Sequence, residues 1–188
     1  MQITSHFLGI ELEAQYFCDL FVEVFAYVKK HSIESAVSFQ NPLSPHITLY
    51  YLKKDESDAD IQEIKEYIAT FDLHSPLYVS GLNYFLRPES KTYILYFTIQ
   101  TDIPLQEYRE RLHHRYQRNQ VEDNTYPFSA HMTFLRIRDS GIFEAHRENI
   151  EKIIHRKLQS LGTVDVNTGR MYVYAVNSHF KEEIQIKL

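Results

Sequence analysis

The sequence has little of what covalent crosslinking, secretion or membrane insertion would require. Cys18 is the only cysteine among 188 residues, so no disulfide can form within the chain. Residues 1–11 alternate apolar and polar side chains and lack the basic start and apolar run of a secretion signal. No stretch approaches the ~18 consecutive apolar residues of a membrane span. We therefore expect a cytoplasmic protein with no membrane association.

Glycine, proline and positive charge are also scarce. Five glycines and six prolines favour regular elements joined by short loops. A net charge of −5 argues against a broad basic surface for long nucleic acid, so a nucleic-acid substrate should be short. Tyrosine and phenylalanine are abundant instead, with 14 and 12 residues, and their rings must fill a core or line a cleft.

Hydrophobic periodicity predicts alternating strands and helices along the whole chain. Apolar residues at helical spacing predict helices over residues 14–30, 58–71, 104–116 and 143–158. Strands are predicted at residues 6–12, 46–52, 77–86, 92–99, 131–137, 170–176 and 183–188. The order strand, helix, strand, helix, strand occurs on each side of about residue 88. This order indicates an internal duplication, with repeats of about 1–88 and 89–188.

The clearest trace of the duplication is a repeated segment of eight residues. Residues 42–49 read PLSPHITL, and residues 127–134 read PFSAHMTF. Each position of the second copy follows its counterpart by 85 residues, as His131 follows His46. Both copies have the pattern proline, apolar, serine, small, histidine, apolar, threonine, apolar. Composition alone does not readily produce this agreement twice.

The repeated segment carries side chains suited to phosphodiester chemistry. On a β-strand, side chains two residues apart share a face, so His46 lies beside Thr48 and His131 beside Thr133. If an approximate two-fold axis relates the halves, two imidazoles and two hydroxyls surround one site. A neutral imidazole can accept a proton from the attacking group, and a protonated one can donate to the leaving oxygen. The hydroxyls can bind non-bridging phosphate oxygens, so neither metal nor cofactor is expected.

Two His-x-Thr segments on separate strands of a duplicated α/β chain resemble the 2H phosphoesterase superfamily. The resemblance is greatest to its 2′-5′ RNA ligase-like, RNA 2′,3′-cyclic phosphodiesterase branch. It implies an α+β fold in a single bilobed domain spanning 1–188, in which duplicated βαβαβ units place two antiparallel-rich sheets across a central cleft. It also implies metal-independent hydrolysis of 2′,3′-cyclic phosphate ends to 2′-phosphomonoesters. His46 and His131 match the catalytic histidines, and Thr48 and Thr133 match the phosphate-binding hydroxyls.

Four further residues are candidates for contact with the substrate. Arg136 follows Thr133 by three residues, where the superfamily often has an arginine, and strand parity predicts that it points away from Thr133. Tyr51 has the equivalent place in the first motif. Tyr126 and Phe128 adjoin the second motif and could stack a base. The core is the expected place for the other aromatic residues considered, Tyr84, Phe85 and Tyr93.

A cluster of basic residues gives a weaker indication of RNA binding. The predicted third helix and the residues after it carry Arg109, Arg111, Arg115 and Arg118. Glu107 and Glu110 lie among them, so a solvated charged face is the expected role of the cluster. The other eight histidines lack metal-ligand spacing with one another or with Cys18, and no metal site is expected.

Three functions are compatible with these motifs. The first is a metal-independent phosphodiesterase that acts on 2′,3′-cyclic phosphate ends or 2′-5′ linked nucleotides, with a 2′-5′ RNA ligase activity left open. The second is a catalytically silent module that binds RNA ends or nucleotides. The third is a phosphodiesterase for a cyclic-phosphate metabolite, which the negative net charge mildly favours. The expected partner is a short RNA or a nucleotide, and the expected state is a monomer.

Overall fold

The computed structural model describes residues 3–52, 57–116, 127–161, 171–177 and 183–186. The helices are α1 (Gln15–Lys30), α2 (Asp58–Ile68), α3 (Leu105–Arg115) and α4 (Ser140–Leu161). The strands are β1 (Ile3–Glu11), β2 (Val37–Phe39), β3 (His46–Leu52), β4 (Leu77–Arg87), β5 (Thr92–Thr101), β6 (His131–Ile137), β7 (Met171–Asn177) and β8 (Glu183–Ile186). Tyr126, Arg118 and residues 170 and 187–188 of the predicted terminal strands lie outside the described residues.

Every helix and strand expected from hydrophobic periodicity is present, with ends that differ by a few residues. Strand β2 was not expected, because three residues are too few for an alternating pattern to be recognised. The turn expected between β4 and β5 contains a short 3-10 helix, Pro88–Ser90. Lys91, which ends this helix, has a left-handed backbone with φ of 49°. The predicted α+β class is therefore confirmed.

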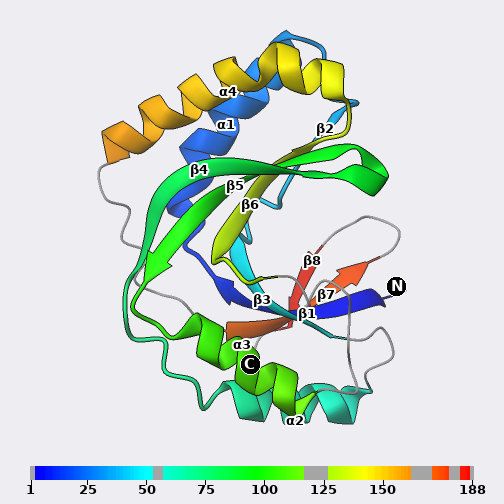
Figure 1. Ribbon diagram of the computed structural model, residues 1–188, viewed down its shortest axis with the longest axis vertical. Helices are drawn as coiled ribbons and strands as arrows, with labels where there is room; N and C mark the ends of the chain where they lie inside the picture. The colour runs from blue at the N-terminus through cyan, green and yellow to red at the C-terminus, as the bar shows by residue number, and fades with distance from the viewer. Residues whose placement is uncertain (1–2, 53–56, 117–126, 162–170, 178–182, 187–188) are drawn as a thin grey trace.

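All eight strands belong to one antiparallel sheet, so the two predicted sheets are joined. The order is β4-β5-β6-β3-β1-β7-β8, and β2 pairs with β6 beside this path. The joint lies between β3 and β6, where Ile47 pairs with Met132. Figure 1 shows the sheet bending at this joint so that its two parts face each other. The bend produces the bilobed shape, although the sheet is continuous.

Helices cover the outer face of each part of the bent sheet (Figure 1). We call β2, β4, β5 and β6 with α1 and α4 the α1/α4 lobe, and β1, β3, β7 and β8 with α2 and α3 the α2/α3 lobe. Each lobe combines elements of both predicted repeats, because β4 pairs with β5 and β1 pairs with β7. The inner faces of the two lobes are consequently left to line a cleft.

The core of the α1/α4 lobe follows from the helical pattern of α1. Its buried residues are the ones that the spacing predicts: Phe17, Leu20, Phe21, Val24 and Val28. The Phe21 ring lies 4.7 Å from that of Phe134 on β6, and the Phe17 ring 5.9 Å from that of Phe97 on β5. Aromatic packing on the outer face therefore supports the strand that carries His131.

None of the described helices combines the length and apolar character needed to cross a bilayer.

Both motif strands carry a β-bulge at the same position. In the β1–β3 ladder, Leu8 pairs with Tyr50 and Gly9 with Thr48, which leaves Leu49 as the extra residue. In the β5–β6 ladder, Leu95 pairs with Leu135 and Tyr96 with Thr133, which leaves Phe134 as the extra residue. A bulge shifts the alternation of side chains by one residue. The third residue after each threonine therefore returns to the threonine's face.

The joint between the lobes gives a test of the fold. Ile47 is completely buried at the pair that links β3 to β6. We expect Ile47→Ala to lower the free energy of unfolding by about 2–5 kcal/mol, because it removes buried methyl groups and leaves a cavity. Urea denaturation measures this change. Val22→Ala, at a position 66% exposed on α1, is the control and should stay within about 0.5 kcal/mol of the parent. A loss of less than about 1 kcal/mol for Ile47→Ala would contradict the buried joint.

Candidate active site

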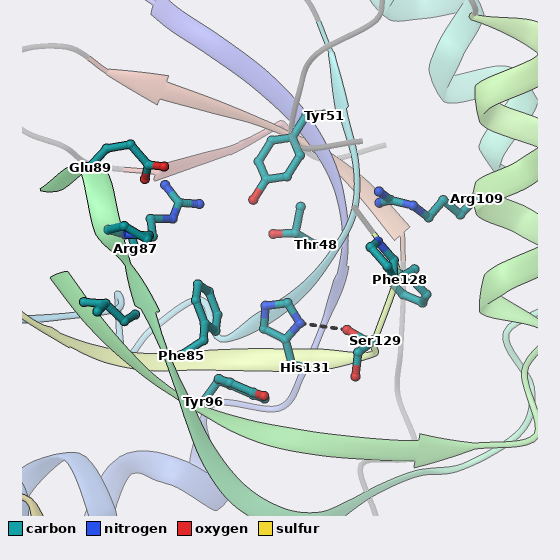
Figure 2. A pocket seen from close by; sticks show the side chains of 13 residues that line it. Thr48, Tyr51, Phe85, Arg87, Glu89, Tyr96, Arg109, Phe128, Ser129 and His131 are labelled. Atoms are coloured by element: carbon teal, nitrogen blue, oxygen red, sulfur yellow. Dashed lines mark hydrogen bonds between the residues drawn. The ribbon is translucent and has the colours of Figure 1, made fainter. Parts of the chain in front are cut away.

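A cavity of about 600 Å³ lies between the two lobes. Strand β3 contributes Thr48 and Tyr51 to its wall, and β4 contributes Phe85 and Arg87. Tyr96 of β5, Arg109 of α3, and Phe128, Ser129 and His131 at the start of β6 complete the part shown in Figure 2. The volume falls within the range usual for sites that bind small ligands.

The pairing at the joint places the two motifs beside each other. Ile47 and Met132 are direct partners in an antiparallel register. When this antiparallel register is extended by one residue in each direction, Thr48 lies opposite His131 and His46 lies opposite Thr133. Paired residues point to the same face, so the four side chains share the face opposite the buried Ile47 and Met132. The joint thereby acts as a local two-fold centre between the two His-x-Thr segments.

Each histidine is oriented by the main chain two residues before it. The Nδ1 atom of His46 lies 2.9 Å from the carbonyl oxygen of Ser44, and Nδ1 of His131 lies 2.7 Å from that of Ser129. A carbonyl oxygen only accepts hydrogen bonds, so Nδ1 carries a proton in both rings. The lone pair of each neutral imidazole is therefore on Nε2. The same bond at both motifs gives both histidines the same tautomer.

These two serines are part of the repeated eight-residue pattern, but the sequence gives no sign of their role. Ser44 and Ser129 act through main-chain carbonyls, which every residue type possesses. The repeat itself indicates that the local backbone is the same in both copies. Only the backbone geometry shows which carbonyl accepts from which ring.

Aromatic rings surround both histidines to different extents. His46 is buried, and its ring centroid lies 4.9 Å from that of Phe7 on β1. His131 is half-buried, with Tyr96 at 5.0 Å and Phe85 at 6.4 Å, both edge-on. Phe85 was expected in the core, but it lines the cavity and is 37% exposed. The prediction that Phe85 lies in the core was wrong because the last five residues of β4, which include Phe85, are exposed.

The environment of His131 favours its neutral form. Burial is the main cause and lowers the pKa of His131 below its usual value of 6.5. The hydrogen bond to the Ser129 carbonyl opposes this change, whereas the nearby positive charge of His46 lowers the pKa further.

The arginines of α3 divide into two groups. Arg111 pairs with Glu107 and Arg115 with Glu63, and all four side chains are exposed, as expected for a solvated face. Arg109 differs, since it is 8% exposed and lines the cavity. Its Nη1 donates to the Leu49 carbonyl over 2.7 Å, and its guanidinium lies 5.3 Å from the Phe128 ring centroid. The expectation of a solvated role was therefore wrong for Arg109, because helical spacing does not show what packs against each face.

The structure describes three of the four candidate substrate contacts, and two of these three line the cavity. Tyr51 and Phe128 line the cavity, as Figure 2 shows. Arg136 lies on the same face as Thr133, contrary to the parity prediction, because the bulge at Phe134 shifts the alternation. Arg136 is not in the cavity wall, and its Nη1 donates to Oε1 of Gln40 over 3.0 Å. Tyr126 lies outside the described residues.

His46 and Thr133 also remain outside the cavity wall, although the joint places them next to Thr48 and His131. Arg87 and Glu89, which the motifs do not indicate, line the cavity from β4 and the 3-10 helix that follows. Within the described ranges, no three His, Cys, Asp or Glu side chains gather closely enough to hold a metal ion.

A family model identifies the chain. The model describes the AKAP7 2′5′ RNA ligase-like domain and matches residues 4–181. The chain belongs to this family. The family is part of the 2H phosphoesterase superfamily, so the superfamily predicted from the repeated motifs is confirmed. No curated protein sequence matches the chain.

Solved structures share the fold of this 2H phosphoesterase-like chain. TT0787 of Thermus thermophilus is 14% identical, with a TM-score of 0.59 over 97% of this chain and 93% of that one. LigT of E. coli in complex with NADP+ is 15% identical, with a TM-score of 0.56 over 99% of this chain and 95% of LigT. LigT with 3′-AMP is 16% identical, with a TM-score of 0.53 over 97% and 95%. At these identities the likeness shows the fold.

The titration of His131 gives a test of the site. NMR should place the midpoint of its imidazole below 6.5, the usual value of its pKa, and His46→Gln should raise it by removing a like charge. Because the folded protein binds this proton less tightly than the unfolded chain, the stability from His131 is fully present above pH 6.5. It decreases as pH falls toward the folded-state pKa. An unchanged midpoint in His46→Gln would contradict the coupling of the two rings.

Proposed function

We propose that the protein is a phosphodiesterase that hydrolyses 2′,3′-cyclic phosphate ends or 2′-5′ linked nucleotides, with His46 and His131 as the acid and base. The observation that supports this most is the arrangement at the joint. There, each histidine has its Nδ1 held by a main-chain carbonyl and a threonine opposite it on the neighbouring strand. This set can bind one phosphate and move protons on two sides of it without reorganisation.

The lowered pKa of His131 supports a division of roles. Neutral His131 would accept a proton at Nε2 from the attacking water, which leaves His46 as the donor to the leaving oxygen. For a cyclic phosphate, water adds to phosphorus, the bond to the 3′ oxygen breaks, and that oxygen takes the proton from His46. The products are a 2′-phosphomonoester and a 3′-hydroxyl. A second proton transfer returns the pair to its starting state.

The threonines supply hydrogen bonds to the phosphate. Thr48 lines the cavity and is opposite His131, while Thr133 is opposite His46. Their hydroxyls would donate to the non-bridging oxygens, whose negative charge grows as water adds. This interaction is stronger in the transition state than in the bound substrate, which is the condition for raising kcat.

The rest of the cavity suits a nucleotide. Phe85, Tyr51 and Phe128 provide aromatic faces for a base, and Arg87 provides positive charge in a chain whose net charge is −5. LigT, which shares the fold, has been solved with NADP+, 3′-AMP and ATP. All three ligands contain an adenine nucleotide. A short RNA end or a single nucleotide is therefore the substrate class that we propose.

A substrate panel with chelator present tests the proposal. The panel contains oligonucleotide 2′,3′-cyclic phosphates, mononucleotide 2′,3′-cyclic phosphates and 2′-5′ linked dinucleotides. We expect chelator-insensitive turnover to 2′-phosphomonoesters, followed by ³¹P NMR. Binding without turnover would indicate a silent nucleotide-binding module. Turnover of mononucleotides alone would indicate a metabolite phosphodiesterase, and loss of activity with chelator would contradict metal independence.

Replacing either histidine should remove most of the activity. We expect His46→Ala and His131→Ala each to lower kcat by about 10²–10⁴-fold, the usual contribution of a general acid or base. The pH profile of the parent should be bell-shaped. His74→Ala is the control, because that side chain is 97% exposed outside the cleft. Unchanged turnover in a folded His131→Ala variant would be incompatible with the mechanism.

Replacing the threonines tests phosphate binding separately. Thr48→Val and Thr133→Val keep the shape of the side chain and remove its hydroxyl. We expect each to lower kcat by about 10²-fold, as the loss of one donor to a developing oxyanion does. Steady-state kinetics on the best substrate of the panel measures this change. Thr101→Val, whose hydroxyl donates to the Pro76 carbonyl away from the cavity, is the matched control.

A further inference from the structure

The extra residue of each bulge, Leu49 in β3 and Phe134 in β6, has a backbone carbonyl that accepts a hydrogen bond from outside the bulged pair of strands. The carbonyl of Phe134, in the second motif, accepts from the Gln40 backbone N–H over 2.9 Å. The carbonyl of Leu49, at the equivalent place in the first motif, accepts from the Arg109 side chain over 2.7 Å. Both residues directly follow a phosphate-site threonine. The two motifs thus have the same contact but different donors.

The difference in donors follows from the topology of the sheet. Strand β2 runs beside β6, with Phe39 paired to Leu135, so the next residue, Gln40, brings its N–H to Phe134. On the edge of β3 that faces β6, the described strands form one pair, Ile47 with Met132, and none of them lies beside β3 as β2 lies beside β6. Helix α3 packs against β3 instead, and Arg109 reaches from it to Leu49. In the part of the chain that the structure describes, the donor to Leu49 is thus a side chain rather than a backbone N–H.

Arg109 also contacts the second motif. Its guanidinium lies over the ring of Phe128, at 5.3 Å from the centroid. Phe128 directly precedes Ser129, whose carbonyl holds Nδ1 of His131. Figure 2 shows Arg109 reaching from α3 across Phe128 toward Thr48. One buried side chain therefore touches the residue after Thr48 and the residue before Ser129.

We propose that Arg109 is a positioning residue that fixes the two His-x-Thr motifs relative to each other. A planar guanidinium can donate in its plane to Leu49 while its face packs on Phe128, whereas a lysine ammonium cannot combine these geometries. Without Arg109, the Leu49 carbonyl would lose this hydrogen bond, and the Phe128–Ser129 segment would lose the packing of the guanidinium on the Phe128 ring. Thr48 and His131 would then shift relative to each other.

The consequence for catalysis depends on the proposed function. Small displacements of reacting groups can cost about 10²-fold in rate, and the loss of a residue that orients a functional ligand typically costs about 10–100-fold. Because the geometry of the acid, base and phosphate donors changes, kcat should fall more than KM rises. A direct contact with the substrate would mainly raise KM.

The experiment compares Arg109→Met with Arg111→Met in the full chain. Arg111 is exposed on the same helix and pairs with Glu107, so the control removes the same charge and shape outside the cleft. We expect kcat on the best cyclic phosphate of the panel to fall about 10²-fold for Arg109→Met. Arg109→Lys should recover little of this loss, and guanidinium ion should partly rescue Arg109→Ala. Arg111→Met should stay within about twofold of the parent.

Two further measurements keep the proposal testable, because the first does not need Arg109→Met to fold and the second does not need turnover. Phe128→Leu keeps the bond from Arg109 to Leu49 and removes the ring, and it should lower kcat about tenfold. The imidazole NMR signals of both His46 and His131 should shift in Arg109→Met, Arg109→Lys and Phe128→Leu, but not in Arg111→Met. If the parent turns over none of the panel, the proposed function fails, while these signals still decide the role of Arg109.

Three results would overturn the proposal. The first is a folded Arg109→Met variant that keeps kcat within about twofold and leaves both histidine signals unchanged. The second is a rise in KM with unchanged kcat, which would make Arg109 a substrate contact. The third is full activity and unchanged signals in both Arg109→Lys and Phe128→Leu, which would mean that neither contact positions the motifs.

Discussion

The site depends on one antiparallel pair, Ile47 with Met132, at the joint of the bent sheet. Both side chains are completely buried on the outer face, which forces their neighbours onto the inner face. A slip of one residue would turn His46, Thr48, His131 and Thr133 into the core. Burial of two apolar residues therefore fixes the arrangement of four polar ones, and the core and the candidate active site are specified by the same contact.

Main-chain geometry supplies most of the orientation within the site. Carbonyls of Ser44 and Ser129 set the tautomer of each histidine, and the bulges at Leu49 and Phe134 return Tyr51 and Arg136 to the inner face. Positive charge is local as well. The chain has a net charge of −5, yet Arg87 and Arg109 line the cavity. A short phosphate-bearing ligand needs only this local field, whereas a long nucleic acid would be opposed by the net negative charge of the chain.

Much of the fold could be predicted because long periodic segments have a strong local signal. The buried face of α1 and all the predicted strands illustrate this. Strand β2 was missed because it is short, and the union of the two sheets was missed because one residue pair leaves no pattern in the sequence. Arg136 was assigned to the wrong face because a bulge adds a residue without changing the apparent alternation. Arg109 was assigned to solvent because its partners, Leu49 and Phe128, are far from it in sequence.

The sequence by itself determined the α+β class, the superfamily and the identity of the repeated His-x-Thr residues, because each depends on residue type and local spacing. Tertiary structure decided which residues meet. It joined the lobes at Ile47 and Met132, brought Phe85 and Arg87 into the cavity, and linked the side chain of Arg109 to the Leu49 carbonyl. These outcomes depend on packing between distant segments, and no local pattern encodes a contact whose partners lie on different elements.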